Sequence, residues 1–316
     1  MDQLGVAAIR AAAADLPEWV LRTPVLPGPL AGTFLKCENL QTTGSYKIRA
    51  SYHVLSRLTP AQRRAGAAIS SSGNFAAAFA CAGAALGIKT TVVMMEKTRP
   101  NKIGRTRKLG AEVVLCENRF EARRSTLERL GREQGLAVID HLEHPGVVLG
   151  HGTVGLEFLE QRPDLGSILV PVSTAGLLAG VALAARALRP GIQVIGVQPA
   201  GANAAVLSFQ ARKLLSIPKV DTVCDALTAP HPGSLPFEVM SRQVDAMVEV
   251  EDGAVLEAVR LLALESHLVV EPGGAVGLAA ALSKTFPAPV GILLSGGNIE
   301  PELLARVIAT AAGAAG

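Results

Sequence analysis

The sequence predicts an α/β protein in which parallel β-sheets are flanked by helices. Short apolar segments rich in β-branched residues alternate with Ala- and Leu-rich segments over most of the 316 residues. Most of the apolar segments are bounded by Gly or Pro, as buried strands are, whereas the Ala- and Leu-rich segments have the length and composition of helices. Such alternation is typical of βαβ units, in which parallel strands lie between two layers of helices.

The predicted strands are short and share a high content of β-branched residues. They cover residues 33–36, 67–70, 90–94, 112–115, 167–172, 193–198 and 290–294. The clearest helical segments between them are residues 74–86, 120–134, 177–188 and 252–265. Because ligands of such sheets bind at the carboxyl ends of the strands, the residues that follow a strand are the first candidates for function.

The length is enough for about two domains of ordinary size. Hydrophobic residues make up 49% of the chain and charged residues 18%, which favours a large packed core over disorder. The chain has no Pro- or Ser-rich linker and no repeat at a fixed period. We therefore expect a small α/β domain, residues 48–146, inserted into a large domain formed by residues 1–47 and 147–316.

Several classes of protein are disfavoured. The net charge of +3 is small and no basic stripe is present, so no nucleic-acid partner is expected. No apolar segment reaches the roughly 18–20 residues of a membrane span, and no signal peptide is recognised. The four cysteines are far apart without a CxxC pair, and the six histidines form no HExxH motif, so neither disulfide nor metal site is expected. We expect a cytoplasmic protein.

The first candidate site is the segment of residues 36–49, in which a strand leads into a turn of small residues and then into a helix that begins at Lys47. The positive end of a helix dipole disfavours a cation and lowers the pKa of a lysine placed there. A neutral amine can attack an aldehyde. The alternative is an ordinary solvated lysine on a helix.

Three other segments also place small polar residues directly after a strand. Residues 70–74 and the turn of residues 173–177 precede helices, whose free amide groups bind carboxylates or phosphates. The turn is neither a Walker loop nor a GxGxxG motif, and tight packing alone would also explain it. Ser295 follows the strand of residues 290–294, and Glu271 is placed to begin a helix, where it could simply stabilise the dipole.

The order and spacing of these segments resemble the fold-type II enzymes that use pyridoxal 5′-phosphate (PLP), in particular the serine/threonine dehydratase and serine racemase family. The resemblance extends from about residue 24 to residue 298. G-S-Y-K-I-R at residues 44–49 is similar to the family's G-S-F-K-x-R, and S-S-G-N at residues 71–74 matches its loop. The resemblance implies a two-domain fold like that of the tryptophan synthase β-subunit, with parallel sheets flanked by helices.

The resemblance also implies a role for individual residues. Lys47 would carry the cofactor and move the substrate's α-proton, and Ser72 would act from the opposite face of the cofactor ring as a proton donor or as a substrate ligand. Asn74 would bind the ring's phenolic oxygen, and Ser295 would meet the pyridine nitrogen. Ser71 and Arg123 are candidates for the substrate carboxylate, together with Ser72 and Asn74. The predicted phosphate-binding residues are Ser173, Thr174, Ala175, Gly176 and Leu177.

The chain departs from the family pattern at several of these places. The phosphate turn reads S-T-A-G at residues 173–176 in place of four glycines, and its side chains restrict positive φ while adding hydroxyl donors. Phe75 replaces a usual His, His151 replaces a usual Gln, and Ala226 replaces a usual Gly. Carboxylates that bind metal in some members are replaced by Gln198, Ala202 and Ala204. We therefore expect no metal ion and a shifted substrate preference.

The predicted reaction is β-elimination of water from a small β-hydroxy amino acid, such as L-threonine or L-serine, to give a 2-oxo acid and ammonia. A neutral hydroxyl at Ser295 need not protonate the ring nitrogen, and a weaker electron sink favours prompt loss of a β-leaving group. The alternatives within the family are an amino-acid racemase and a dehydratase for 3-hydroxyaspartate or of hydroxyectoine degradation. The alternative of another class is a non-catalytic protein that binds PLP or another anion. The expected assembly is a homodimer.

Overall fold

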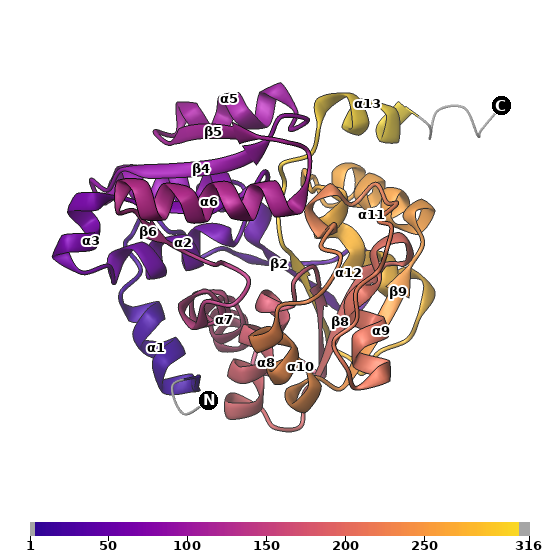
Figure 1. The fold of residues 1–316 in the computed structure, drawn as a ribbon. Coiled ribbons are helices and arrows are strands. Elements are labelled where there is room, and N and C mark those ends of the chain that lie inside the picture. Colours follow the sequence, from indigo (N-terminus) through magenta and orange to yellow (C-terminus); the bar gives the residue numbers. More distant parts are fainter. Residues whose placement is uncertain (1–3, 310–316) are drawn as a thin grey trace.

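The structure is a computed structural model that describes residues 4–309, and it contains two β-sheets covered by helices (Figure 1). The larger sheet has six strands in the order β1-β2-β10-β7-β8-β9, and the smaller has four in the order β5-β4-β3-β6. The strands are β1 Val25–Pro27, β2 Thr33–Cys37, β3 Ala67–Ser70, β4 Thr90–Met95, β5 Glu112–Cys116, β6 Ala137–Val138, β7 Ser167–Pro171, β8 Gln193–Pro199, β9 Ala246–Val250 and β10 Val290–Leu294.

All strand pairs are parallel except β1 with β2, which is antiparallel. The predicted parallel α/β fold is therefore confirmed, and each predicted strand is present to within one or two residues. Three strands were not predicted: β1 is three residues long and contains a proline, β6 has two residues, and β9 is a half-buried edge strand. Because β2, β10 and β7 are neighbours and parallel, their carboxyl ends lie along one edge of the sheet.

Helices cover the sheets, as the alternating pattern predicts (Figure 1). They are α1 Val6–Ala14, α2 Lys47–Ser56, α3 Pro60–Ala65, α4 Asn74–Ala85, α5 Pro100–Lys108, α6 Phe120–Gln134, α7 Pro145–Gln161, α8 Gly176–Leu188, α9 Ala204–Ala211, α10 Ser234–Gln243, α11 Asp252–Leu264, α12 Pro272–Ser283 and α13 Pro301–Ala309. Helices α7 and α8 touch at Gly152 and Gly180, where a Cβ on Gly180 would lie 2.5 Å from the Gly152 nitrogen. This close approach places the residues beside Gly152 against the first turns of α8.

The two sheets draw on different parts of the chain. All strands of the four-stranded sheet lie between residues 67 and 138, whereas those of the six-stranded sheet lie before residue 38 or after residue 166. This division supports the inserted small domain of residues 48–146, although the exact boundaries stay a prediction. Residues 1–3 and 310–316 of the predicted large domain lie outside the described residues.

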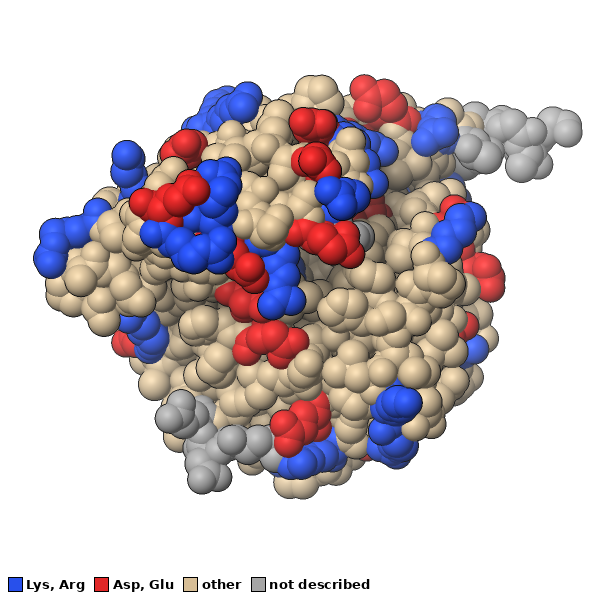
Figure 2. All heavy atoms as spheres, viewed as in Figure 1, with Lys and Arg blue, Asp and Glu red and all other residues tan. Residues whose placement is uncertain are grey.

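The described part of the chain contains no helix long and apolar enough to span a membrane. On the face shown in Figure 2, acidic and basic side chains are interspersed rather than gathered in one basic band. Within residues 4–309, no three His, Cys, Asp or Glu side chains are arranged to hold a metal ion. The buried Gln198 instead accepts hydrogen bonds from the amides of Ala205 and Val206, at 2.9 and 3.0 Å, and so caps α9.

Candidate active site

Lys47 is the first residue of α2, and the turn before it places this residue beside the end of β10. Gly44 adopts a left-handed conformation, with φ 66°, and a Cβ at this position would collide with the side chain of Asn298. The amide of Tyr46 donates a hydrogen bond of 3.2 Å to the carbonyl of Ser295. The small-residue turn of the sequence motif therefore brings the lysine next to the polar residues that follow β10.

The Lys47 amine is half-buried among aromatic rings. Its Nζ lies 4.5 Å from the ring centroid of Tyr46 and 5.6 Å from that of Phe75. Burial lowers the pKa of Lys47 to about 7, against the opposing attraction of the Glu271 carboxylate. Loss of hydration disfavours the charged amine, so a large neutral fraction is present near pH 7. A neutral amine is the form that attacks a carbonyl group.

Glu271, Asn74 and Asn298 form a hydrogen-bonded chain beside this amine. Asn74 Nδ2 donates to Glu271 Oε1 at 2.6 Å, and Asn298 Nδ2 donates to Asn74 Oδ1 at 2.7 Å. Glu271 is only 3% exposed, and its pKa is raised to about 7 by burial and then by the charge of Asp225. It precedes α12 as expected, but its side chain accepts no hydrogen bond from the amides of that helix. Glu271 thus belongs to the site rather than to a helix cap.

The predicted phosphate turn, residues 173–177, connects β7 to the N-terminus of α8. Ala175 is the N-cap residue in a left-handed conformation, with φ 67°, and no side chain caps the first turn of the helix. Ser173 and Thr174 are half-buried, whereas Gly176 and the residues after it are buried. The first amides of a helix carry a partial positive charge and lack intrahelical partners. This helix start is therefore suited to an anion.

Ser295 lies immediately after β10 and is 5% exposed. Its carbonyl accepts the hydrogen bond from the amide of Tyr46. The side chain is neutral at every accessible pH. It can therefore partner a ring nitrogen without holding a proton on it.

Ser71 and Ser72 follow β3, directly before Asn74. The Ser72 hydroxyl accepts a hydrogen bond of 3.1 Å from the hydroxyl of Thr98, and Ser71 is buried. Arg123 of α6 donates from Nε to the Ser70 hydroxyl at 2.7 Å and from Nη2 to the Ser70 carbonyl at 2.9 Å. The guanidinium thus supports the end of β3, and its predicted role in holding a substrate carboxylate stays a prediction.

Two histidines that motif analysis did not assign a role lie beside Lys47. The His151 ring is 4.7 Å from that of Tyr46, and the His141 ring is 4.8 Å from that of Phe75. Burial, and next the charge of Lys47, lowers the pKa of His141 to about 3 and that of His151 well below its ordinary value. Both imidazoles are therefore neutral near pH 7. The only signal in the sequence is that His151 stands where the family usually has Gln.

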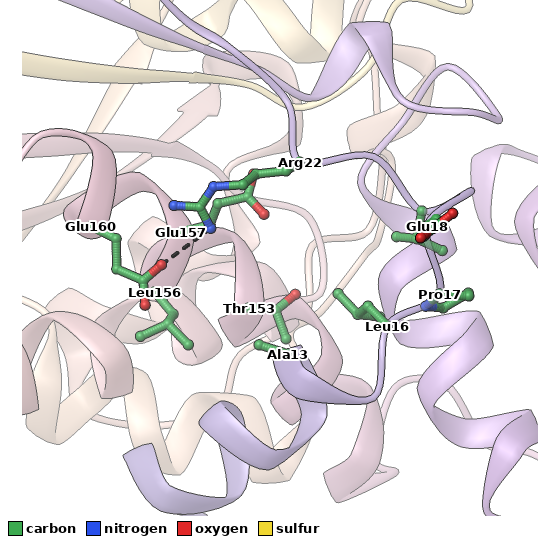
Figure 3. A pocket seen from close by; sticks show the side chains of 10 residues that line it. Ala13, Leu16, Pro17, Glu18, Arg22, Thr153, Leu156, Glu157 and Glu160 are labelled. Carbon is green, nitrogen blue, oxygen red and sulfur yellow. Dashed lines mark hydrogen bonds and ion pairs between the residues drawn. The ribbon is translucent and has the colours of Figure 1, made fainter.

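Two surface cavities are present near these elements. One of about 290 Å³ is lined by residues that include Asn74, Glu271 and Asn298, and it opens beside the site. The other, of about 380 Å³, lies between the end of α1 and α7 and contains no predicted site residue. In Figure 3 its α7 glutamates face Arg22 on one side, while Leu16 and Pro17 line the other. Of the predicted site residues, the first cavity is lined by Asn74 alone, and Lys47, Ser295 and residues 173–177 are not part of its wall.

Comparison with known proteins gives relatives over nearly the whole chain. The chain is 36% identical over 277 residues to L-threonine ammonia-lyase of Thermotoga maritima, a match that covers 87% of this chain and 69% of that protein. It is 36% identical over 306 residues to L-threo-3-hydroxyaspartate ammonia-lyase of a Pseudomonas species, covering 94% and 96%. The solved structure of maize serine racemase superposes with a TM-score of 0.92, at 33% identity and with 98% of both chains covered.

The observed groups fit PLP on chemical grounds. Attack on a carbonyl carbon requires a neutral amine, which Lys47 supplies, and the uncapped start of α8 is suited to a phosphate. The Ser45 hydroxyl and both nitrogens of His151 are buried beside this site without a well-formed hydrogen bond to a described residue, so they are available to bind a ligand. The residues present therefore suit an aromatic phosphate ester with a reactive carbonyl group.

The family described as pyridoxal-phosphate dependent enzyme matches residues 18–296. This match confirms the predicted cofactor, and the structural neighbours confirm the predicted fold-type II architecture. The ammonia-lyases among the relatives support a PLP-dependent lyase. This chain belongs to the pyridoxal-phosphate dependent enzyme family.

Proposed function

We propose that this enzyme removes water from a small β-hydroxy amino acid, such as L-threonine or L-serine, and yields a 2-oxo acid and ammonia. The observation that carries the proposal is the neutral, nearly buried hydroxyl of Ser295 at the end of β10, next to the turn that holds Lys47. A hydroxyl leaves the cofactor a moderate electron sink, which favours rapid loss of a β-substituent. The ammonia-lyases that resemble the chain support the same reaction class.

Lys47 would hold the cofactor through Nζ and, once released by the substrate's amino group, would remove the proton from the substrate's α-carbon. When bound, PLP withdraws electrons from that carbon and so makes the proton removable. The lowered pKa of Lys47 matches this role, because a base with a pKa near the working pH both accepts and returns a proton readily.

The other predicted residues would bind and orient. Residues 173–177 would hold the phosphate with the amides of the first turn of α8, and Asn74 would donate to the phenolic oxygen. Ser71, Ser72 and Arg123 would bind the substrate carboxylate, and the Ser72 hydroxyl would face the substrate from the side opposite Lys47. The bond from Asn298 to Asn74 fixes the orientation of the Asn74 amide.

A substrate panel tests the reaction. Purified enzyme is incubated with L-threonine, L-serine, 3-hydroxyaspartate and phenylserine, and both 2-oxo acid and ammonia are measured. We expect equal amounts of the two products from at least one of these amino acids. Lys47→Ala should show no turnover, and borohydride should fix the cofactor to the Lys47 peptide of the wild type only. Full activity in the variant, or no product from any substrate, would overturn the proposal.

A racemase is the second candidate. The superposition with maize serine racemase over 98% of both chains favours it, and Lys47 and Ser72 would exchange protons on opposite sides of the α-carbon. A racemase inverts its substrate without releasing ammonia, so chiral analysis of the same reactions distinguishes the two candidates. Dehydration of 3-hydroxyaspartate or in hydroxyectoine degradation remains a variant of the first candidate, which the panel also addresses.

The predictions on organisation belong to the same proposal. We infer a small domain of residues 48–146 within a large domain, a homodimer, and a cytoplasmic location. The domain division is supported by the separation of the strands, because each sheet is formed by a different part of the chain. Light scattering of the holoenzyme measures the assembly directly.

A further inference from the structure

His151 is a buried imidazole whose ring nitrogens make no well-formed hydrogen bond with the described residues. Its side chain is 2% exposed, and neither Nδ1 nor Nε2 has a partner at hydrogen-bonding geometry. The backbone of Gly176 interacts with the ring, but it acts on the pKa of His151 less than burial and the nearby charges do. Buried polar groups in folded proteins are almost always hydrogen-bonded, because leaving one unpaired costs free energy. An unpaired imidazole beside a binding site therefore indicates that a ligand atom completes its bonding.

The ring of His151 faces the start of α8. Nδ1 lies 3.4 Å from the point where a Cβ on Gly176 would stand, and Gly176 is the first residue of that helix. The close contact of Gly152 with Gly180 holds α7 against α8 next to this ring. The unpaired nitrogens and the uncapped helix amides are thus two separate observations at one place.

The charge state of the ring suits a hydrogen bond rather than an ion pair. Burial, with the charges of Lys47 and His141 acting in the same direction, keeps the pKa of His151 well below its ordinary value, and the smaller opposing effect of the Gly176 backbone does not reverse this. A neutral imidazole carries one N–H donor and adds no positive charge near the Lys47 amine. The positive end of the α8 helix dipole then stabilises the negative charge of the phosphate, and the hydrogen bond from the imidazole orients the phosphate.

We propose that His151 is a phosphate-binding residue, which donates a hydrogen bond from a ring N–H to the phosphate held by the first turn of α8. The turn of residues 173–177 carries side chains that restrict its backbone, and His151 adds a donor from a different helix. The proposal concerns the cofactor and not the substrate, so it stands or fails independently of the ammonia-lyase reaction.

Two variants separate the hydrogen bond from packing. His151→Phe keeps a flat ring against Tyr46, which lies 4.7 Å away, but removes both nitrogens. His151→Gln restores an N–H donor on a side chain of different shape. Holoenzyme of each protein is dialysed against graded PLP to measure its dissociation constant, and the cofactor-free protein is titrated with pyridoxal, which lacks the phosphate. Thermal unfolding of each protein measures whether the fold is retained.

We expect His151→Phe to weaken PLP binding about 10- to 100-fold, the usual effect of losing a hydrogen bond to a charged group, and to leave pyridoxal binding unchanged. The dissociation constants of His151→Gln for PLP and for pyridoxal should each stay within about threefold of the wild-type values, because the N–H donor is restored. PLP binding by His151→Phe within threefold of wild type would overturn the proposal, and so would an equal loss for PLP and pyridoxal. If His151→Phe does not fold, His151→Met takes its place, because methionine fills irregular apolar space.

Discussion

The side-chain amide of Asn74 donates a 2.6 Å hydrogen bond to the carboxylate of Glu271. Asn74 begins α4, which packs on the four-stranded sheet, and Glu271 directly precedes α12, which packs on the six-stranded sheet. The bond therefore joins the two sheets at the site. Because one partner titrates, the contact between the sheets responds to pH.

The Glu271 carboxyl predicts a pH dependence of stability. Its pKa rises from 4.5 in the unfolded chain to about 7 in the fold, so the folded state holds the proton more tightly. Its contribution is greatest below pH 4.5 and falls by up to about 3 kcal/mol as pH rises through 7. Glu271→Gln keeps an oxygen for Asn74 but cannot ionise. The variant should therefore gain stability relative to wild type between pH 5 and pH 8.

Urea unfolding of both proteins at the two pH values measures this difference, since effects of all other titrating groups cancel in the comparison. A difference between variant and wild type that stays the same at both pH values would show that Glu271 titrates normally.

The Lys47 amine predicts how cofactor capture depends on pH. Burial lowers its pKa to about 7, so the protonated, unreactive form dominates below that value and the neutral form above it. The rate at which cofactor-free protein acquires the yellow absorbance of bound PLP should rise with pH and level off above about 7. Lys47→Ala serves as the control without an amine. A rate that still climbs steeply at pH 9 would show an amine of ordinary basicity.

The left-handed Ala175 predicts that glycine stabilises the phosphate turn. A residue with a Cβ at φ 67° is strained by about 1–2 kcal/mol, whereas glycine is not, although glycine loses more entropy on folding. Ala175→Gly should raise the free energy of unfolding by about 0.5 kcal/mol, the balance of the two effects. Ala187→Gly, at an exposed right-handed position of α8, should lower it by about 1 kcal/mol. Chemical unfolding of both variants measures these two changes. A loss of stability in both variants would show that Ala175 is not strained.

The strands that carry the site are predictable because they are buried on both faces. The predicted segments of residues 67–70 and 290–294 coincide with β3 and β10, since a continuous apolar run ends at a small polar residue in each. Strand β9 is half-buried and is not a continuous apolar run that ends at a small polar residue, so it was not predicted. Ser71 and Ser295, which directly follow β3 and β10, then follow from the rule on carboxyl ends, whereas Lys47 is identified by its motif at the start of α2.

The contacts between distant segments are not predictable in this way. The bond between Asn74 and Glu271 joins positions 197 residues apart, and only the packing of two sheets brings them together. His151 lies within an ordinary helical segment, and its one local signal, that it stands where the family usually has Gln, does not distinguish a ligand from a packed ring. Its burial and its unpaired nitrogens become visible only in three dimensions.

Substitution of Arg49, the last residue of the lysine motif, should change the stability of the protein rather than its catalysis. Its fully buried guanidinium binds Glu38 through two hydrogen bonds of 2.8 and 2.9 Å and Glu157 through two of 3.0 Å. Arg49→Met would leave buried carboxylates short of a partner and should lower the free energy of unfolding by about 3–5 kcal/mol. Arg22→Met is the matched control, because Arg22 forms an exposed ion pair with Glu160 one turn further along α7, and its loss should cost less than about 1 kcal/mol (Figure 3). Urea unfolding of the cofactor-loaded variants measures both changes. Equal losses would mean that the buried ion pairs of Arg49 contribute no more to stability than a surface contact does.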